Sequence, residues 1–208
     1  MKNKEEFILN ELDKIYSNAR CELNYNKDYE LLIATVLSSQ CTDSRVNKVT
    51  KVLFSKYDIF SLKDADIKDI EKIIYSVGTY HKKAMFIKNI AKELVTKYNG
   101  KVPNDRNFLE SLDGVGRKTC NVVLSNIYNE PALAVDTHVK RVSLRLGLTK
   151  SNDPSKVEKD LMMKFPKKSW NKLHHQLVLF GRYKCKSRSP ICLDCPFKMI
   201  CNYKKNSN

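Results

Sequence analysis

Residues 107–124, NFLESLDGVGRKTCNVVL, predict two helices joined by a tight glycine turn. Five apolar side chains recur at helical spacing on both sides of the turn and should pack against one another: Leu109, Leu112, Val115, Val122 and Val123. Gly114 and Gly116 allow positive φ and let the backbone approach a ligand closely. Because the first N–H groups of the second helix have no partner within it, the turn is a natural seat for a phosphate.

Helical periodicity dominates the rest of the chain, and the predicted fold class is all-α. Amphipathic stripes occur near the N-terminus (Ile8, Leu12, Ile15 and Tyr16), in the middle (Ile87, Ile90, Ala91, Leu94 and Val95) and near the C-terminus (Trp170, Leu173, Leu177 and Val178). Residues 29–37 are apolar nearly all round, which predicts a helix buried at the centre of a domain. No segment combines alternating hydrophobicity with hairpin signals, so we expect no strand.

The composition indicates a polyanionic partner. The 208 residues include 38 Lys and Arg against 23 Asp and Glu, which gives a formal net charge of +15. Nucleic acid fits this charge better than a membrane, since apolar stretches such as 31–37 are far shorter than the roughly 20 residues of a membrane span. The N-terminal MKNKEEF lacks the features of a signal or transit peptide. We therefore expect a cytoplasmic protein that associates with the nucleoid.

The seven cysteines fall into two groups. Three are scattered through apolar or helical sequence and should pack as small hydrophobes: Cys21, Cys41 and Cys120. The other four lie near the C-terminus, with gaps of six, two and five residues between them: Cys185, Cys192, Cys195 and Cys201. Four thiolates at this spacing predict a soft-metal site, and the spacing alone leaves both tetrahedral zinc and an iron–sulfur cluster open.

Two ionisable residues next to helix starts are candidates for chemistry. Lys118 follows Arg117 at the start of the second helix, where the positive field favours a neutral, nucleophilic amine. Taken alone, a GxGxK pattern more often marks a phosphate contact than a nucleophile. Asp136 precedes THVKRV and an apolar helical run, which is typical of a helix N-cap.

Together these motifs resemble the endonuclease III family of DNA glycosylases with AP-lyase activity. Residues 112–119 are similar to that family's helix-hairpin-helix, and residues 131–139, PALAVDTHV, to its second signature. The cysteine spacing is similar to the one that closes the endonuclease III and adenine-glycosylase families, and the resemblance covers nearly the whole chain. It implies that Lys118 is the nucleophile, that Asp136 is catalytic and that the four cysteines hold a [4Fe-4S] cluster. It also implies that the neighbouring histidines are packing residues rather than ligands: His174 and His175.

The resemblance further implies two helical domains. Residues 22–132 would form a six-helix bundle that contains the helix-hairpin-helix at about 107–126. Residues 1–21 together with 133–208 would form a discontinuous domain that carries the cluster loop, residues 185–201. The active site would then lie in a cleft between these domains.

DNA contacts follow from the same resemblance. The hairpin would seat a phosphate on four consecutive residues: Gly114, Val115, Gly116 and Arg117. Gln40 matches the residue that fills the space left by a flipped base. Thr79 departs from the family pattern, because the second inserting residue is usually a leucine after a glycine, so either His81 takes over by stacking or the wedge is weaker. Asp113 stands where the family commonly has proline, which loosens the hairpin.

The cluster loop carries further basic residues. Lys186 and Arg188 lie between the first two cysteines, with Pro190 after them. On a loop fixed by a cluster these side chains would grip phosphate; the alternative is that they are solvated surface charges.

The implied function is base excision repair by a monomer acting on double-stranded DNA with damaged bases or abasic sites. The enzyme would remove oxidised pyrimidines and cleave the strand 3′ to the abasic site by β-elimination through a lysine Schiff base. One alternative is a monofunctional adenine or mismatch glycosylase; that group generally lacks the lysine matched by Lys118 and has a further C-terminal domain, for which a chain ending at Asn208 leaves no room. Another is a non-catalytic metal-dependent DNA-binding protein, in which Lys118 and Asp136 are only contact and cap residues.

Overall fold

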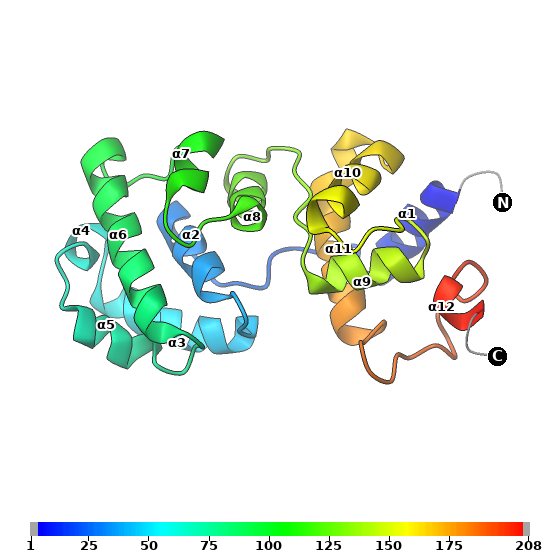
Figure 1. The fold of residues 1–208 in the computed structure, drawn as a ribbon, viewed down its shortest axis with the longest axis horizontal. Coiled ribbons are helices and arrows are strands. Elements are labelled where there is room, and N and C mark those ends of the chain that lie inside the picture. Colours follow the sequence, from blue (N-terminus) through cyan, green and yellow to red (C-terminus); the bar gives the residue numbers. More distant parts are fainter. Residues whose placement is uncertain (1–3, 206–208) are drawn as a thin grey trace. The chain divides into compact units, whose positions relative to one another are not determined.

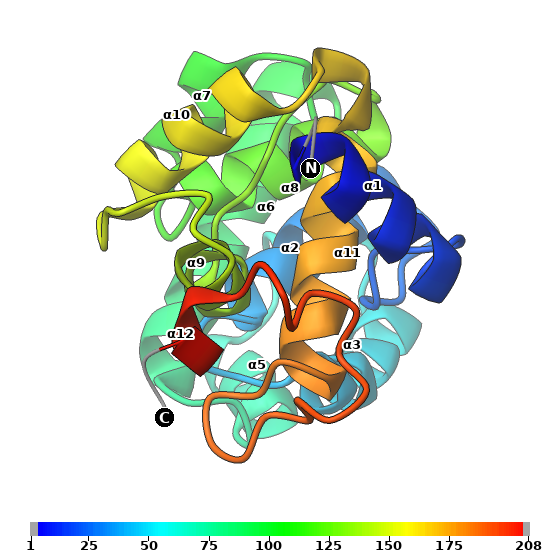
Figure 2. The ribbon, with the colours of Figure 1, turned by 90° about the vertical axis from the view of Figure 1, so that its right-hand side faces the viewer.

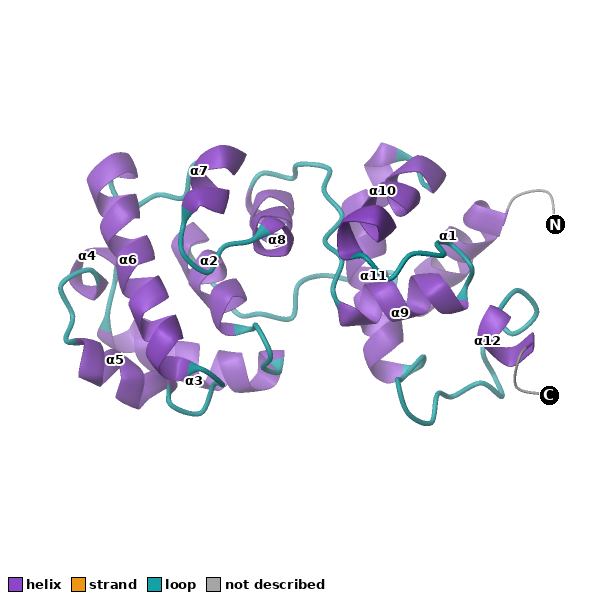
Figure 3. Cartoon of the chain, in the orientation of Figure 1, coloured by secondary structure: helices purple, strands orange, loops and turns teal. Residues whose placement is uncertain are grey.

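The computed structural model describes residues 4–205, so the first three residues of the N-terminal stretch considered above lie outside it. Every regular element in this range is helical, and no strand occurs among these residues (Figure 3). The predicted all-α class is therefore confirmed. None of the helices in the described part of the chain is long and apolar enough to cross a membrane.

The chain divides into two compact units (Figure 1). Unit 1 comprises Met1–Arg20 and Asn129–Asn208, and unit 2 comprises Cys21–Tyr128. Each unit has its own hydrophobic core.

Unit 2 is built around a central buried helix, α2. Its helices are α2 (Asp28–Leu37), α3 (Asp43–Lys56), α4 (Ile59–Leu62), α5 (Ile67–Ile74), α6 (Tyr80–Tyr98), α7 (Arg106–Ser111) and α8 (Arg117–Ile127). Helices α3, α6 and α8 all contact α2. Every residue from Tyr29 to Leu37 is buried, as the apolar run predicts. The α2 N-terminus is closed by Glu30, whose carboxylate accepts the N–H groups of Asn26 and Lys27 at 2.7 and 3.3 Å.

Unit 1 is organised around α11. Its helices are α1 (Lys4–Ile15), α9 (Thr137–Arg145), α10 (Pro154–Lys164), a short 3-10 turn (Lys167–Ser169), α11 (Trp170–Tyr183) and α12 (Asn202–Lys205). Helices α1 and α9 lie against α11 (Figure 2). Ile8 and Leu12 of the predicted first stripe are fully buried, whereas Ile15 and Tyr16, where α1 ends, are only half-buried.

Candidate active site and metal centre

The predicted glycine turn joins α7 to α8 and is fixed by its backbone and its apolar residues. Gly114 has φ +80°, and a Cβ there would lie 2.5 Å from the ring of Phe86, so only glycine fits. Gly116 instead has extended backbone with φ −94° and is the N-cap of α8, so the expectation of positive φ holds for Gly114 alone. Leu112 and Val115 on the turn are both buried.

Lys118 is the second residue of α8 and is exposed to solvent. The next residues, Thr119 and Cys120, are buried, so the helix turns Lys118 away from the core. The N-cap glycine has no side chain that could accept the first N–H groups. Lys118 therefore stands beside the positive end of the helix dipole, with its amine in solvent.

A buried amide connects the two helices of the hairpin. Arg106 at the start of α7 donates to Asn121 Oδ1 of α8 at 2.9 Å and to Glu110 Oε1 at 3.1 Å. Asn121 is only 2% exposed. The bond between Arg106 and Asn121 therefore joins the start of α7 to α8.

Asp136 is the N-cap of α9, as the sequence predicts. Its Oδ1 accepts the N–H groups of His138 and Val139, both at 2.8 Å. Capping thus engages Oδ1 rather than Oδ2. The start of α9 is packed closely on α11, because a Cβ on Gly181 would lie 2.8 Å from the His138 Cβ atom.

Arginines of α9 hold the segment that follows α11. Arg141 donates to the carbonyl oxygens of Gly181 at 2.7 Å and of Cys185 at 3.1 Å. One turn further along α9, Arg145 donates to the carbonyl oxygens of Lys186 at 2.7 Å and Ser187 at 3.2 Å. The helix capped by Asp136 thereby fixes the beginning of the cysteine loop, residues 185–201.

The four cysteines of this loop are free thiols, of which Cys201 is buried and the others are half-buried. Burial raises the pKa of the Cys195 thiol, and the neighbouring thiols of Cys185, Cys201 and Cys192 raise it further. The Cys195 thiol therefore lies within electrostatic range of each of the other three thiols. Between residues 4 and 205 no three or more His, Cys, Asp or Glu side chains are gathered around a single ion site.

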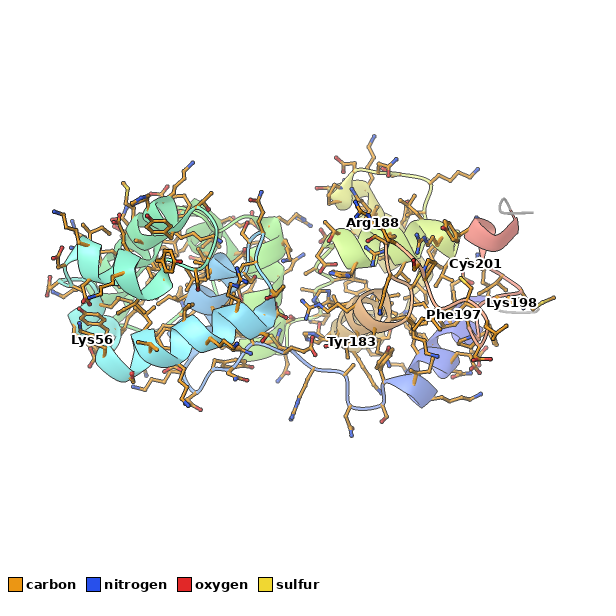
Figure 4. All side chains as sticks on the ribbon, turned by 90° about the horizontal axis from the view of Figure 1, so that it is seen from below. Lys56, Tyr183, Arg188, Phe197, Lys198 and Cys201 are labelled. Atoms are coloured by element: carbon orange, nitrogen blue, oxygen red, sulfur yellow. The ribbon has the colours of Figure 1, made fainter. Side chains whose placement is uncertain are left out.

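The donor set fits an iron–sulfur cluster. All four groups are thiols, which are the ligands of [4Fe-4S] clusters, and Arg145 lies 3.3 Å from the Cys185 sulfur, where it can donate to a thiolate. Phe197 (Figure 4) anchors the loop. It is fully buried and packs edge-on against Phe7 and Phe180, with ring centroids 6.1 and 5.1 Å away.

The basic residues of the loop are exposed. Lys186 and Arg188 are both exposed to solvent, and Ser189 beside them has φ +49°. His174, by contrast, is a packing residue of α11, with its ring Nδ1 2.7 Å from the Ala134 carbonyl oxygen. Burial lowers the pKa of His175 to about 3.

The two candidate inserting residues share an unusual backbone conformation. Gln40, in the turn after α2, has φ +55°, and Thr79, the N-cap of α6, has φ +56°. Both side chains are exposed. A left-handed backbone costs a residue other than glycine about 1 kcal/mol, so both turns must be held by their surroundings. His81 is paired with Glu71 at 2.8 Å, and its ring lies 4.0 Å from that of Tyr80.

A cavity of about 630 Å³ is lined by residues that follow Gln40 and residues that precede Thr79: Thr42, Ser44, Arg45, Lys48, Tyr75 and Ser76. Arg45 donates to the Ser76 carbonyl oxygen at 3.3 Å and so connects the two segments. The cavity therefore carries two basic side chains beside both candidate inserting turns.

A family model described as HhH-GPD superfamily base excision DNA repair protein matches residues 33–167. The chain belongs to this superfamily. It is 45% identical over 201 residues to endonuclease III of Bacillus subtilis, covering 94% of this chain and 90% of the relative. It is also 44% identical over 204 residues to endonuclease III of Rickettsia conorii, covering 94% of this chain and 96% of the relative.

Several solved structures are similar to this chain. A trapped endonuclease III–DNA covalent intermediate matches with TM-score 0.93 and 46% identity, covering 100% of this chain and 99% of that one. A non-covalent endonuclease III–DNA complex matches with TM-score 0.94 at the same identity and coverage. A thermostable thymine-DNA glycosylase matches with TM-score 0.85 at 23% identity, covering 97% of each chain, and shows the fold alone.

Sequence reasoning missed several residues that hold the hairpin and the cysteine loop. Arg106, Arg141 and Arg145 were not singled out, because their partners lie far along the chain or are backbone carbonyl oxygens. The spacing of Arg141 and Arg145, one helical turn apart after the Asp136 cap, is the only local signal for the last two.

Proposed function

We propose that this chain is a bifunctional DNA glycosylase and AP lyase that removes oxidised pyrimidines from duplex DNA, with Lys118 as its nucleophile. The observation that carries the proposal is the hairpin, in which Gly114 permits the turn and α8 presents Lys118 to solvent at its positive end. The similar protein trapped as a covalent intermediate with DNA supports an attack by an enzyme group on the substrate.

In the proposed first step the neutral amine of Lys118 attacks C1′ of the damaged nucleotide. A C–N bond forms as the glycosidic bond breaks, and the base leaves with the bonding electrons and takes up a proton. Opening of the sugar ring then gives a Schiff base between Nζ and C1′. The exposed position of Lys118 leaves its amine accessible to a flipped nucleotide.

The second step is β-elimination. The iminium acidifies the hydrogen on C2′, and removal of that proton expels the 3′ phosphate. The products are an unsaturated aldehyde on one fragment and a phosphate on the other, and water releases the lysine. The electrons balance without an added oxidant or reductant.

Asp136 would stabilise the cationic sugar and assist deprotonation of the amine. Its Oδ1 accepts two backbone N–H groups, which hold the carboxyl group in place, and its Oδ2 is left for the substrate. Neutral asparagine would keep the cap but lose the charge.

We propose DNA contacts at the hairpin, at the cysteine loop, at Gln40 and at Thr79. The hairpin residues Gly114 to Arg117 would hold a phosphate with backbone N–H groups, and Lys186 and Arg188 would hold another. Gln40 and Thr79 would enter the space vacated by the flipped nucleotide. His81 is turned to Glu71, which supports Thr79 rather than His81 in that role.

Cys185, Cys192, Cys195 and Cys201 would hold a [4Fe-4S] cluster that cross-links the loop and fixes its basic residues. Because the proposed substrate is duplex DNA, the enzyme would act on chromosomal DNA in the nucleoid.

The test is covalent trapping. Purified protein is incubated with a duplex containing one thymine glycol, borohydride is added, and the adduct is measured for the wild type, Lys118→Ala and Lys68→Ala. Lys68 is the matched control, because it is also an exposed second residue of a helix, α5. We expect adducts with the wild type and Lys68→Ala and none with Lys118→Ala, since borohydride reduces only an imine.

Other outcomes identify the alternatives. Base release without an adduct would indicate a monofunctional glycosylase. A colourless protein that binds DNA but gives neither base release nor an adduct would indicate a zinc-dependent binding protein, because an iron–sulfur cluster absorbs visible light.

A further inference from the structure

A buried lysine contacts both candidate inserting turns, the one that contains Gln40 and the one that contains Thr79. Lys83, on the first turn of α6, is only 3% exposed. Its Nζ donates to the carbonyl oxygens of Leu37 at 3.0 Å and Ser39 at 2.6 Å. Both partners are main-chain oxygens rather than carboxylates. Burial lowers the pKa of Lys83 below its usual value, with a smaller opposing effect from the Cys41 thiol.

The side chain closes the C-terminal end of α2. The last carbonyl oxygens of a helix lack partners within it, and a cation there is favoured by the helix dipole. The Ser38 N–H still donates to the Ala34 carbonyl oxygen within the helix. The carbonyl oxygens of Leu37 and Ser39 instead accept from the Lys83 amine. The Ser39 carbonyl oxygen belongs to the peptide bond between Ser39 and Gln40. This contact therefore fixes the peptide plane that precedes Gln40, the residue with the left-handed backbone.

The main chain of the same lysine fixes the second turn. The Lys83 N–H donates to the Thr79 carbonyl oxygen at 3.1 Å, which is the first bond of α6. Lys83 therefore holds Thr79 through its backbone and the Gln40 turn through its side chain. These two turns contain two of the few residues other than glycine with positive φ in the described chain.

We propose that Lys83 is a positioning residue that couples the Gln40 turn to the Thr79 turn, so that both enter DNA as one rigid wedge. The proposal rests on the proposed function, because it concerns the opening of the duplex before base release. Removing the amine leaves the buried Leu37 carbonyl oxygen and the part-buried Ser39 carbonyl oxygen without this donor and frees the Gln40 turn to relax from its left-handed conformation.

The experiment compares Lys83→Met with a matched control, Lys88→Met. Lys88 lies on the same helix and also donates to a carbonyl oxygen, that of Ala65 at 2.6 Å, away from both turns. We measure single-turnover base release from a thymine glycol duplex and borohydride trapping on a preformed abasic duplex. Circular dichroism confirms that each variant is folded.

We expect Lys83→Met to slow base release about 100-fold, as misplacement of a positioning group by about 1 Å does. Trapping on the abasic duplex should fall far less, because the abasic nucleotide leaves the helix at lower cost. Lys88→Met should match the wild type in both assays. Equal losses on both substrates, or equal effects of the two lysine variants, would overturn the proposal.

A double-mutant cycle with Gln40→Ala tests the coupling itself. If Lys83 acts through the Gln40 turn, Gln40→Ala slows base release in the wild type but causes no further loss in Lys83→Met. Losses that multiply would overturn the proposal. Should Lys83→Met fail to fold, Lys83→Gln, which removes the cation but keeps a polar side chain, takes its place in the same cycle.

A readout without catalysis separates this proposal from the proposed function. 2-Aminopurine placed beside an abasic-site analogue brightens when the duplex is opened, whether or not a bond is cleaved. Brightening with the wild type that is lost in Lys83→Met supports the wedge even if no adduct is trapped. Equal brightening with both proteins overturns it even if Lys118 chemistry is established.

Discussion

The hairpin of unit 2 and the cysteine loop of unit 1 are held by different means. In the hairpin the turn is fixed by residues close in sequence: a glycine with positive φ, buried Leu112 and Val115, and the two short helices that flank it. The cysteine loop has little regular structure between α11 and α12, and distant groups hold it, namely Arg145 of α9 and the core around Phe197.

This difference predicts how each region fails. A turn determined by its own residues is sensitive to single backbone changes and indifferent to bound groups. A loop held from outside depends on its cross-links, including the proposed cluster. The predictions below test that distinction, beginning with the largest expected effect.

Removing one cluster ligand should destabilise the loop and leave the hairpin intact. In Cys192→Ala we expect the visible absorbance to be lost and unit 1 to lose about 3 kcal/mol or more, as when a loop-closing cross-link is removed. Hydrogen exchange measured peptide by peptide should increase in residues 185–201 and not in residues 112–124. Cys21→Ala, in the half-buried packing of unit 2, is the control.

Equal exchange in both regions of Cys192→Ala would contradict the distinction. So would an unchanged visible spectrum, which would show that Cys192 is not a ligand.

Lowering the pH should destabilise unit 1 before unit 2. Burial lowers the pKa of His175 from 6.5 to about 3, with a smaller contribution from His174. The unfolded state then binds more protons between these values, so the stability present above pH 6.5 is lost as the pH falls toward 3. Between pH 7 and pH 4 the loss should be about 3 kcal/mol. Urea unfolding followed by hydrogen exchange at pH 7 and pH 4 measures it.

His175→Gln should flatten this pH dependence, and His81→Gln, at an exposed position, is the control. A slope that survives in His175→Gln would assign the acid sensitivity to other groups.

Local signals explain why much of the site could be predicted from the sequence. The Gly114 turn, the Asp136 cap and the buried run of α2 each depend on residues within a few positions, and the structure bears out all three. Gly116 shows the limit, since a glycine permits positive φ without requiring it, and here it serves as an extended N-cap.

The missed residues act over long distances in the chain. Lys83 and Arg145 bond to carbonyl oxygens 44 and 41 residues away, and a carbonyl oxygen has no signature in the sequence. The sequence showed only that Thr79 has a different side chain from the leucine usual in the family. In the structure Thr79 also has a left-handed backbone, which the sequence does not report.

Gly114→Ala should damage the hairpin more than Gly116→Ala. At position 114 the methyl group meets Phe86 and the backbone has φ +80°, so we expect a loss of about 2 kcal/mol of stability and weaker DNA binding. At position 116 the space is open and φ is −94°, and the cost should stay below about 1 kcal/mol. Denaturant titration of both variants decides, and equal losses would show that the turn is not fixed by Gly114.

Arg145→Met should loosen the cysteine loop by a smaller amount. The guanidinium supplies bonds to the Lys186 and Ser187 oxygens and stacks on Tyr203 at 4.1 Å, and losing them should cost about 1–2 kcal/mol. Arg188→Met removes an equal charge from an exposed side chain and is the matched control. Hydrogen exchange of residues 186–189 should increase in Arg145→Met alone. If both variants exchange alike, the loop is held without α9, and its order derives from the cysteines and Phe197.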